Sequence, residues 1–113
     1  MTDHEMLHVR IDHEREGVTR VFLRGELDLS SAPDLVETIS GLNSHGLSEL
    51  VLDLSELVFV DSTGLSVFVT VHKRLRAEGK RFVLASPNLQ FVRLVQITGL
   101  SEYFDVVDQA SQL

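Results

Sequence analysis

The residues Asp61, Ser62, Thr63 and Gly64 lie between a short apolar run, residues 57–60, and the start of a helical pattern. The side chains that follow recur at three-and-four spacing, which predicts a helix with one buried face; they are Leu65, Phe68, Val69, His72 and Leu75. Because Ser and Asp oxygens accept the free N–H groups of a first helical turn, we expect Ser62 to lie exposed at a helix start. Gly64 would let another backbone approach closely.

A hydroxyl at a helix start can act as a charge switch. The helix N-terminus favours an anion such as a phosphate, whereas the carboxylate of Asp61 repels one. Phosphorylation of Ser62 would add about −1.5 to −2 charges without requiring a new fold. Thr63 is a second hydroxyl and a minor alternative site. The residues alone leave a plainer interpretation open, in which this segment is only a cap and a turn.

Two further carboxylates, Glu26 and Asp28, follow the second expected strand. A loop at that position can reach toward the Ser62 turn. From the residues alone, these side chains are either ordinary loop carboxylates or part of a binding site around Ser62.

No known catalytic motif surrounds Ser62. The G-x-S-x-G pattern of hydrolases is absent because Val60 occupies the first glycine position, and the phosphate-binding and dinucleotide-binding glycine motifs are absent too. The chain has no cysteine, which excludes disulfides and thiolate chemistry. We expect no enzyme activity, no cofactor and no metal site, and we interpret all five histidines as surface or core residues: His4, His8, His13, His45 and His72.

The length of 113 residues predicts a single domain, 1–113, with an ordered core of about residues 6–108. A net charge of −7 disfavours direct binding of nucleic acid. The N-terminus lacks the pattern of a signal peptide, and no apolar run is long enough to span a bilayer. We therefore expect a soluble, cytoplasmic protein without membrane insertion.

The remaining pattern predicts alternating strands and helices. Residues 7–12 and 18–24 are expected to form a hairpin whose first strand is half-buried; a helix follows, capped by Ser30 or Ser31 and stopped near Gly46. A short buried strand is expected at 51–54, then the helix from Ser62 to about Glu78 and a strand at 81–85. Ser86-Pro87-Asn88 is a turn and N-cap signal that opens a third helix with Thr98 facing inward, and a last strand is expected within 103–107. This order predicts an α/β fold: a mixed sheet of about four to five strands with helices packed mainly on one face.

Two motifs resemble those of STAS domains, specifically the stand-alone bacterial anti-sigma factor antagonists. They are Gly25-Glu26-Leu27-Asp28 with Ala32, and Asp53-Leu54-Ser55, Leu57, Phe59 with Asp61-Ser62-Thr63-Gly64-Leu65. The resemblance implies that the unphosphorylated protein binds an anti-sigma factor that is also a GHKL-type serine kinase, which releases a sigma factor. It implies phosphorylation at Ser62, reset by a phosphatase, and partner contact through Glu26, Asp28, Asp61, Ser62, Thr63 and Gly64.

Two alternative functions are compatible with the same fold. In one, the domain is a scaffold subunit of a larger assembly, such as a lipid-transport complex or a stress-sensing particle. In the other, it binds a small ligand or nucleotide, although no motif for such a pocket is present.

Overall fold

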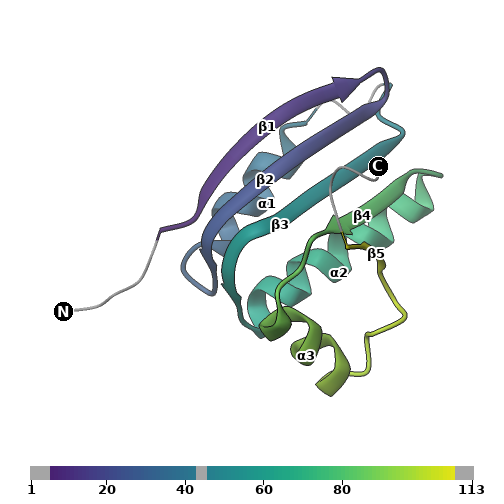
Figure 1. Ribbon diagram of the computed structural model, residues 1–113. Helices are drawn as coiled ribbons and strands as arrows, with labels where there is room; N and C mark the ends of the chain where they lie inside the picture. The colour runs from purple at the N-terminus through teal and green to yellow at the C-terminus, as the bar shows by residue number, and fades with distance from the viewer. Residues whose placement is uncertain (1–5, 43–45, 109–113) are drawn as a thin grey trace.

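The computed structural model describes residues 6–42 and 46–108, which form one five-stranded sheet in the order β1-β2-β3-β4-β5. The strands are β1 (His8–Arg15), β2 (Val18–Leu27), β3 (Glu49–Val60), β4 (Arg81–Ala85) and β5 (Asp105–Val107). β1 is antiparallel to β2, and every later pair of neighbours is parallel, so the sheet is mixed (Figure 1).

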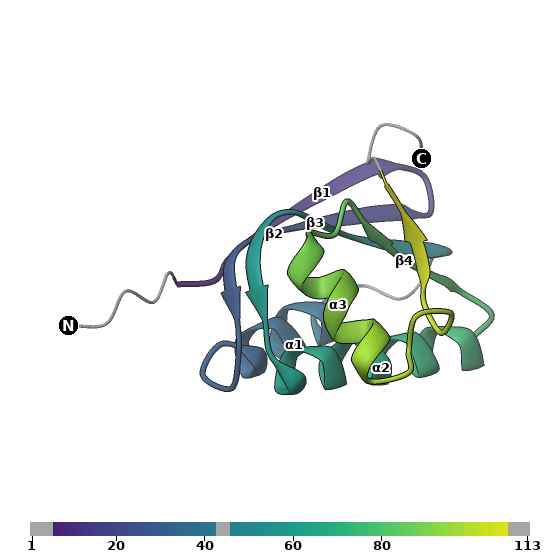
Figure 2. The same cartoon turned by 60° about the horizontal axis from the view of Figure 1, so that its bottom comes forward.

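Three helices connect the parallel strands and lie on one face of the sheet (Figure 2). They are α1 (Ala32–Ser40), α2 (Ser62–Ala77) and α3 (Leu89–Ile97). The main core fills the space between sheet and helices, where the ring of Phe68 lies 6.5 Å from that of Phe82 and 5.9 Å from that of Phe91. The architecture confirms the α/β fold class and the one-sided placement of the helices. No helix among the described residues is long and apolar enough to cross a membrane.

The opposite face of the sheet carries a buried ion pair. Arg20 donates from Nη1 to Asp53 at 3.0 Å and from Nε to Glu14 at 2.7 Å. Asp53 also accepts hydrogen bonds from the backbone and hydroxyl of Ser55 at 3.0 and 2.6 Å. Because a carboxylate buried without partners is very costly, these donors allow Asp53 to occupy the middle of β3.

Several expected boundaries were wrong. The expected strand at 51–54 and the apolar run after it form one strand of 12 residues, with irregular pairing to β2 near its end. α1 ends at Ser40 with Gly41 as its C-cap, so Gly46 is not the cap, and residues 43–45 lie outside the described residues. In the edge strand β1, Ile11 is 41% exposed, so this strand is less buried than expected. Thr98 is the exposed C-cap of α3 and does not face inward.

Candidate functional site

The start of α2 is organised by Asp61, not by the serine that follows it. Asp61 is the N-cap, and its Oδ1 accepts a hydrogen bond from the backbone N–H of Gly64 at 2.9 Å. Ser62 is the first residue of the helix and is exposed, whereas Thr63 is partly buried. The expected exposed hydroxyl at a helix start is therefore confirmed, with the capping role moved one residue earlier.

Asp61 also ties this turn to the loop between β2 and α1. Its Oδ2 accepts a hydrogen bond from the backbone N–H of Leu29 at 3.2 Å. In return, the backbone N–H of Asp61 donates to the carbonyl of Leu27 at 3.1 Å. The two motif segments, which are separated by about thirty residues, thus meet at one edge of the sheet, because the parallel strands β2 and β3 end side by side.

Asp28 shapes the loop that Asp61 holds. Its carboxylate accepts hydrogen bonds from the hydroxyl of Ser30 at 2.8 Å and from the backbone N–H groups of Ser30 and Ser31 at 3.0 and 3.1 Å. The hydrogen bond from the Ser30 hydroxyl, followed by those from Ser31, lowers the pKa of Asp28, although desolvation opposes the shift. Asp28 therefore carries a negative charge beside the start of α1, and its contact with a partner stays a prediction.

Glu26 lies beside β3 at the irregular end of β2. It is opposite Phe59 in the parallel register and is partly buried. Its backbone carbonyl accepts a hydrogen bond from the hydroxyl of Ser31 at 2.9 Å. The same hydroxyl accepts from the backbone N–H of Asp28 at 2.9 Å, so the Ser31 oxygen is engaged within the loop and makes no side-chain cap on α1. The role of the Glu26 carboxylate in partner binding also stays a prediction.

Gly64 packs the first turn of α2 against the sheet. A Cβ atom at this position would lie 2.7 Å from Cγ of Leu27 and 3.0 Å from Cγ1 of Val60. The close neighbours are therefore side chains of β2 and β3, and the expectation of an approaching backbone was wrong. Because Gly64 is buried, it sets how closely Ser62 approaches the end of the sheet.

Two amides at the start of α3 hold the end of β3, and the sequence predicted one of them, Asn88, but only as the N-cap of this helix. The pairing of β3 with β4 ends at Asp53, so the later part of β3 has no strand on that side among the described residues. The amide of Gln90 fills this edge, accepting from the N–H of Val60 at 3.0 Å and donating to its carbonyl at 2.8 Å. Asn88, the expected N-cap of α3, also donates to the carbonyls of Leu57 and Val58 at 3.0 and 3.2 Å.

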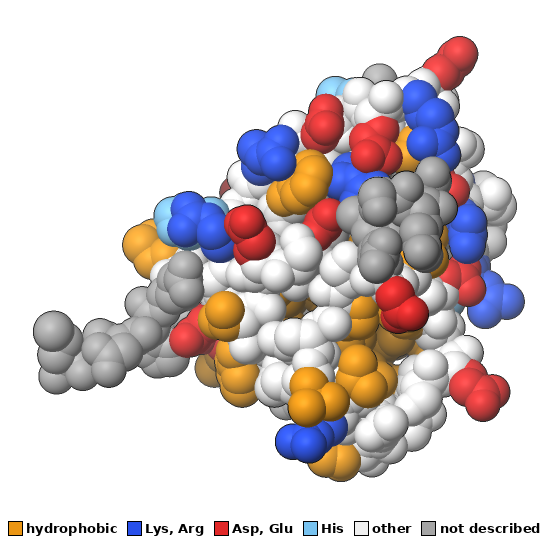
Figure 3. Space-filling model, in the orientation of Figure 1, with side chains coloured by type: hydrophobic (Ala, Val, Ile, Leu, Met, Phe, Trp, Pro, Cys, Tyr) orange, Lys and Arg blue, Asp and Glu red, His pale blue; other side chains and the backbone are white. Residues whose placement is uncertain are grey.

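Exposed apolar side chains surround this end of the molecule. Hydrophobic groups gather on the face shown in Figure 3 around α3 and the end of β3. Leu29, in the loop that Asp61 holds, is 72% exposed, and Phe59, two residues before Asp61, is 40% exposed. Leu89, at the start of α3, is 61% exposed. Such a group of exposed apolar side chains is typical of a surface that another protein covers.

The described histidines form no metal site. No group of three or more His, Asp and Glu side chains among residues 6–42 and 46–108 could hold a metal, and His4 and His45 lie outside those residues. His72 is buried against Phe82, Phe104 and the edge of Tyr103, and neither ring nitrogen makes a hydrogen bond of good geometry among the described residues. Burial is the main cause that lowers the pKa of His72.

The chain is similar to proteins of one family over most of its length. The STAS domain family matches residues 11–112. The anti-sigma-B factor antagonist of Bacillus subtilis is 33% identical over 101 residues, which cover 88% of this chain and 92% of that relative. The anti-sigma-B factor antagonist of Listeria monocytogenes is 36% identical over 86 residues, 76% of this chain and 75% of the relative.

A solved structure has the same fold. The crystal structure of an anti-sigma factor antagonist from Mycobacterium paratuberculosis superimposes with a TM-score of 0.82 at 25% identity, covering 94% of this chain and 89% of that one. The two motifs meet at one edge of the sheet, and the two sequence relatives cover 88% and 76% of the chain. The chain therefore belongs to the STAS domain family and, within it, to the anti-sigma factor antagonists.

Proposed function

We propose that phosphorylation of Ser62 switches this anti-sigma factor antagonist off. Unphosphorylated, it binds an anti-sigma factor that is also a GHKL-type serine kinase, and the sigma factor is released. The kinase transfers the γ-phosphate of ATP to Oγ of Ser62 with loss of the hydroxyl proton, and a phosphatase later removes it. The observation that carries this proposal is the exposed Ser62 at the first position of α2, beside a capping carboxylate.

The local chemistry explains why one phosphate would be enough. The N–H group that Asp61 caps is already satisfied by its carboxylate, so a phosphate on Ser62 meets a negative neighbour as well as the positive helix end. It would also bring about −1.5 to −2 charges among exposed apolar side chains, where burial under a partner is costly. A tenfold loss of affinity requires only about 1.4 kcal/mol.

The proposal assigns the chain a regulatory role with no catalytic step and no cofactor of its own. The partner contact is inferred to centre on Asp61, Ser62 and Thr63, with Glu26 at the end of β2 and Asp28 on the loop that follows. The kinase, its bound ATP and the sigma factor act in the cytoplasm, so we infer that this protein acts there as well.

The test compares charge at Ser62 with the same charge one turn later. Ser66 is exposed on α2, and its hydroxyl donates to the carbonyl of Ser62 at 3.0 Å, so Ser66→Asp is a matched control. We expect Ser62→Ala to bind the anti-sigma factor constitutively, Ser62→Asp to bind at least tenfold more weakly, and Ser66→Asp to lie close to wild type. Equal affinity of Ser62→Ala and Ser62→Asp, measured by titration calorimetry, would refute the switch.

Phosphosite mapping by mass spectrometry provides a second test in the native cells. Phosphate on Ser62 that rises and falls with growth and stress supports the switch, and phosphate on Thr63 alone moves the site by one residue. A Ser62 peptide that is well covered and always bare, from protein that co-purifies in a large assembly, would instead favour the scaffold role.

A further inference from the structure

A hollow of about 360 Å³ lies between α1 and α2. Val36 and Ile39 line it from α1, and Val67 and Val71 line it from α2. Thr63 and Thr70 add hydroxyls from α2. A volume of this size with mostly apolar walls and a few polar groups is typical of a small-molecule site.

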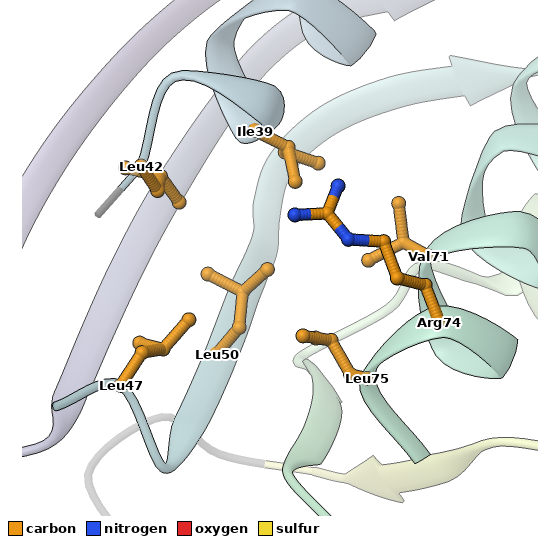
Figure 4. A pocket seen from close by; sticks show the side chains of 7 residues that line it. All are labelled: Ile39, Leu42, Leu47, Leu50, Val71, Arg74 and Leu75. Atoms are coloured by element: carbon orange, nitrogen blue, oxygen red, sulfur yellow. The ribbon is translucent and has the colours of Figure 1, made fainter. Parts of the chain in front are cut away.

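Beside it along α2 lies a much smaller cavity of about 10 Å³, room for about one water molecule, which Figure 4 shows from close by. The two share Ile39, Val71 and Arg74 and are therefore adjacent, and we call them together the groove. At 1.5 Å per residue, the stretch of α2 from Thr63 to Arg74 is about 16 Å long. The groove therefore suits an elongated ligand rather than a compact one.

Arg74 places a positive charge over this apolar groove. Figure 4 shows its guanidinium group between Ile39, Leu50 and Val71, directed toward them and away from its own helix. Its ion pair is with Glu78, from Nε at 3.6 Å, and both side chains are more than a third exposed. Such an exposed pair contributes only a few tenths of a kcal/mol. Among the described residues, the two Nη groups have no acceptor.

We propose that this groove binds a small amphipathic carboxylate. Its hydrocarbon part lies between α1 and α2, and its carboxylate accepts two hydrogen bonds from the Nη groups of Arg74. A planar guanidinium matches a carboxylate in this two-pronged geometry, and the apolar walls strengthen the pair by excluding water.

A small ligand fits the groove better than a protein does. A specific protein contact covers about 800 Å² on each partner and is anchored by exposed large apolar side chains. The exposed apolar side chains Leu29, Phe59 and Leu89 do not line the groove. Within residues 6–42 and 46–108, Val36 is the one exposed large apolar side chain that does.

The experiment titrates the full chain with decanoate and, as a neutral probe of the same length, with decan-1-ol. Binding is followed by calorimetry and located from backbone amide shifts. We expect saturable decanoate binding at one site, with shifts at Thr63, Val67 and Val71. Arg74→Gln should weaken decanoate at least tenfold and leave decan-1-ol unchanged. Arg76→Gln removes an equal charge from the same helix without lining the groove, and it should change neither probe.

Blocking variants test the walls without touching the buried core. Thr70→Trp and Val36→Trp each fill the groove from an exposed position, one on each helix, and should abolish binding of both probes. A cooperative thermal unfolding transition shows that each variant is folded. If one variant does not fold, the other still tests whether filling the groove abolishes binding.

Three outcomes would overturn the proposal. The first is that decanoate does not saturate. The second is an equal loss of affinity in Arg74→Gln and Arg76→Gln. The third is amide shifts in the groove that depend on protein concentration without any probe, which would assign the groove to a second copy of the chain.

Discussion

Replacing Gly64 with alanine tests how tightly the start of α2 is packed against the sheet. The new Cβ would lie 2.7 Å from Cγ and 2.9 Å from Cδ2 of Leu27, and 3.0 Å from Cγ1 of Val60. Real Cβ atoms essentially never come as close as the two contacts with Leu27, and the contact with Val60 is tighter than most, so Leu27 or the helix itself must move. Leu27 is fully buried, and it therefore has little room to move.

The expected free-energy change is the difference between two opposing effects. Alanine is favoured over glycine inside a helix by about 1 kcal/mol. Inserting a methyl group into a tightly packed site costs about 1–3 kcal/mol. We therefore expect Gly64→Ala to lower the free energy of unfolding by about 1 kcal/mol, which corresponds to a fall of about 4 °C in Tm for a domain of this size.

Gly41 provides the matched control. It is the C-cap of α1 with a negative φ of −81°, and its Cβ would lie 3.5 and 3.6 Å from the nearest atoms, which are the carbonyl oxygens of Glu37 and Thr38. We expect Gly41→Ala to be neutral or slightly stabilising in urea and thermal unfolding followed by circular dichroism. If Gly64→Ala is as stable as wild type or more stable, the packing argument is wrong.

Three further predictions concern buried or capping groups. Unfolded histidine takes up a proton near pH 6.5, whereas burial first, and Arg76 second, lower the pKa of folded His72 against the opposing effects of Asp105 and the Tyr103 backbone. The unfolded state therefore binds more protons below about pH 6.5, so the free energy of unfolding should decrease as the pH is lowered through that range. The urea midpoint should be lower at pH 5.5 than at pH 7.5, and His72→Leu should make this difference smaller. Asp61→Ala removes the α2 cap and the bond to Leu29, and should cost about 1–2 kcal/mol in urea unfolding, with a smaller loss for Asp61→Asn, which keeps an acceptor. Gln90→Leu leaves the N–H and carbonyl of Val60 without their partner, so it should lower the free energy of unfolding by about 1–3 kcal/mol and speed hydrogen exchange at the Val60 amide. The control Gln96→Leu, at an exposed position of the same helix, should have neither effect. Equal effects of the two variants would contradict the role of Gln90 at the edge of β3.

Local patterns were enough to locate most elements and the hydroxyl that we propose as the switch. The strand at 81–85, the cap at Asn88 and the start of α2 depend on apolar periodicity and on side chains that bond within their own turn, so neighbouring residues carry the signal. The sequence left open whether the loop with Asp28 contributes to the Ser62 turn; the structure brings the two together, because the parallel strands β2 and β3 end at the same edge of the sheet. The family, the α/β class and the position of Ser62 followed from these short-range features.

Other features depend on residues about thirty positions apart, which no local pattern records. Gln90 pairs with the edge of β3 only because β4 is too short to cover it. Gly64 is crowded by the side chain of Leu27 rather than by a backbone, because β2 continues three residues beyond its expected end. The burial of His72 and the groove beneath Arg74 arise from helices and loops that pack together. The sequence alone predicted the approximate helix starts, the mixed sheet and the exposed hydroxyl of Ser62. The tertiary structure decided which side chains support that hydroxyl and where a cation lies over an apolar hollow, because both depend on packing between distant segments.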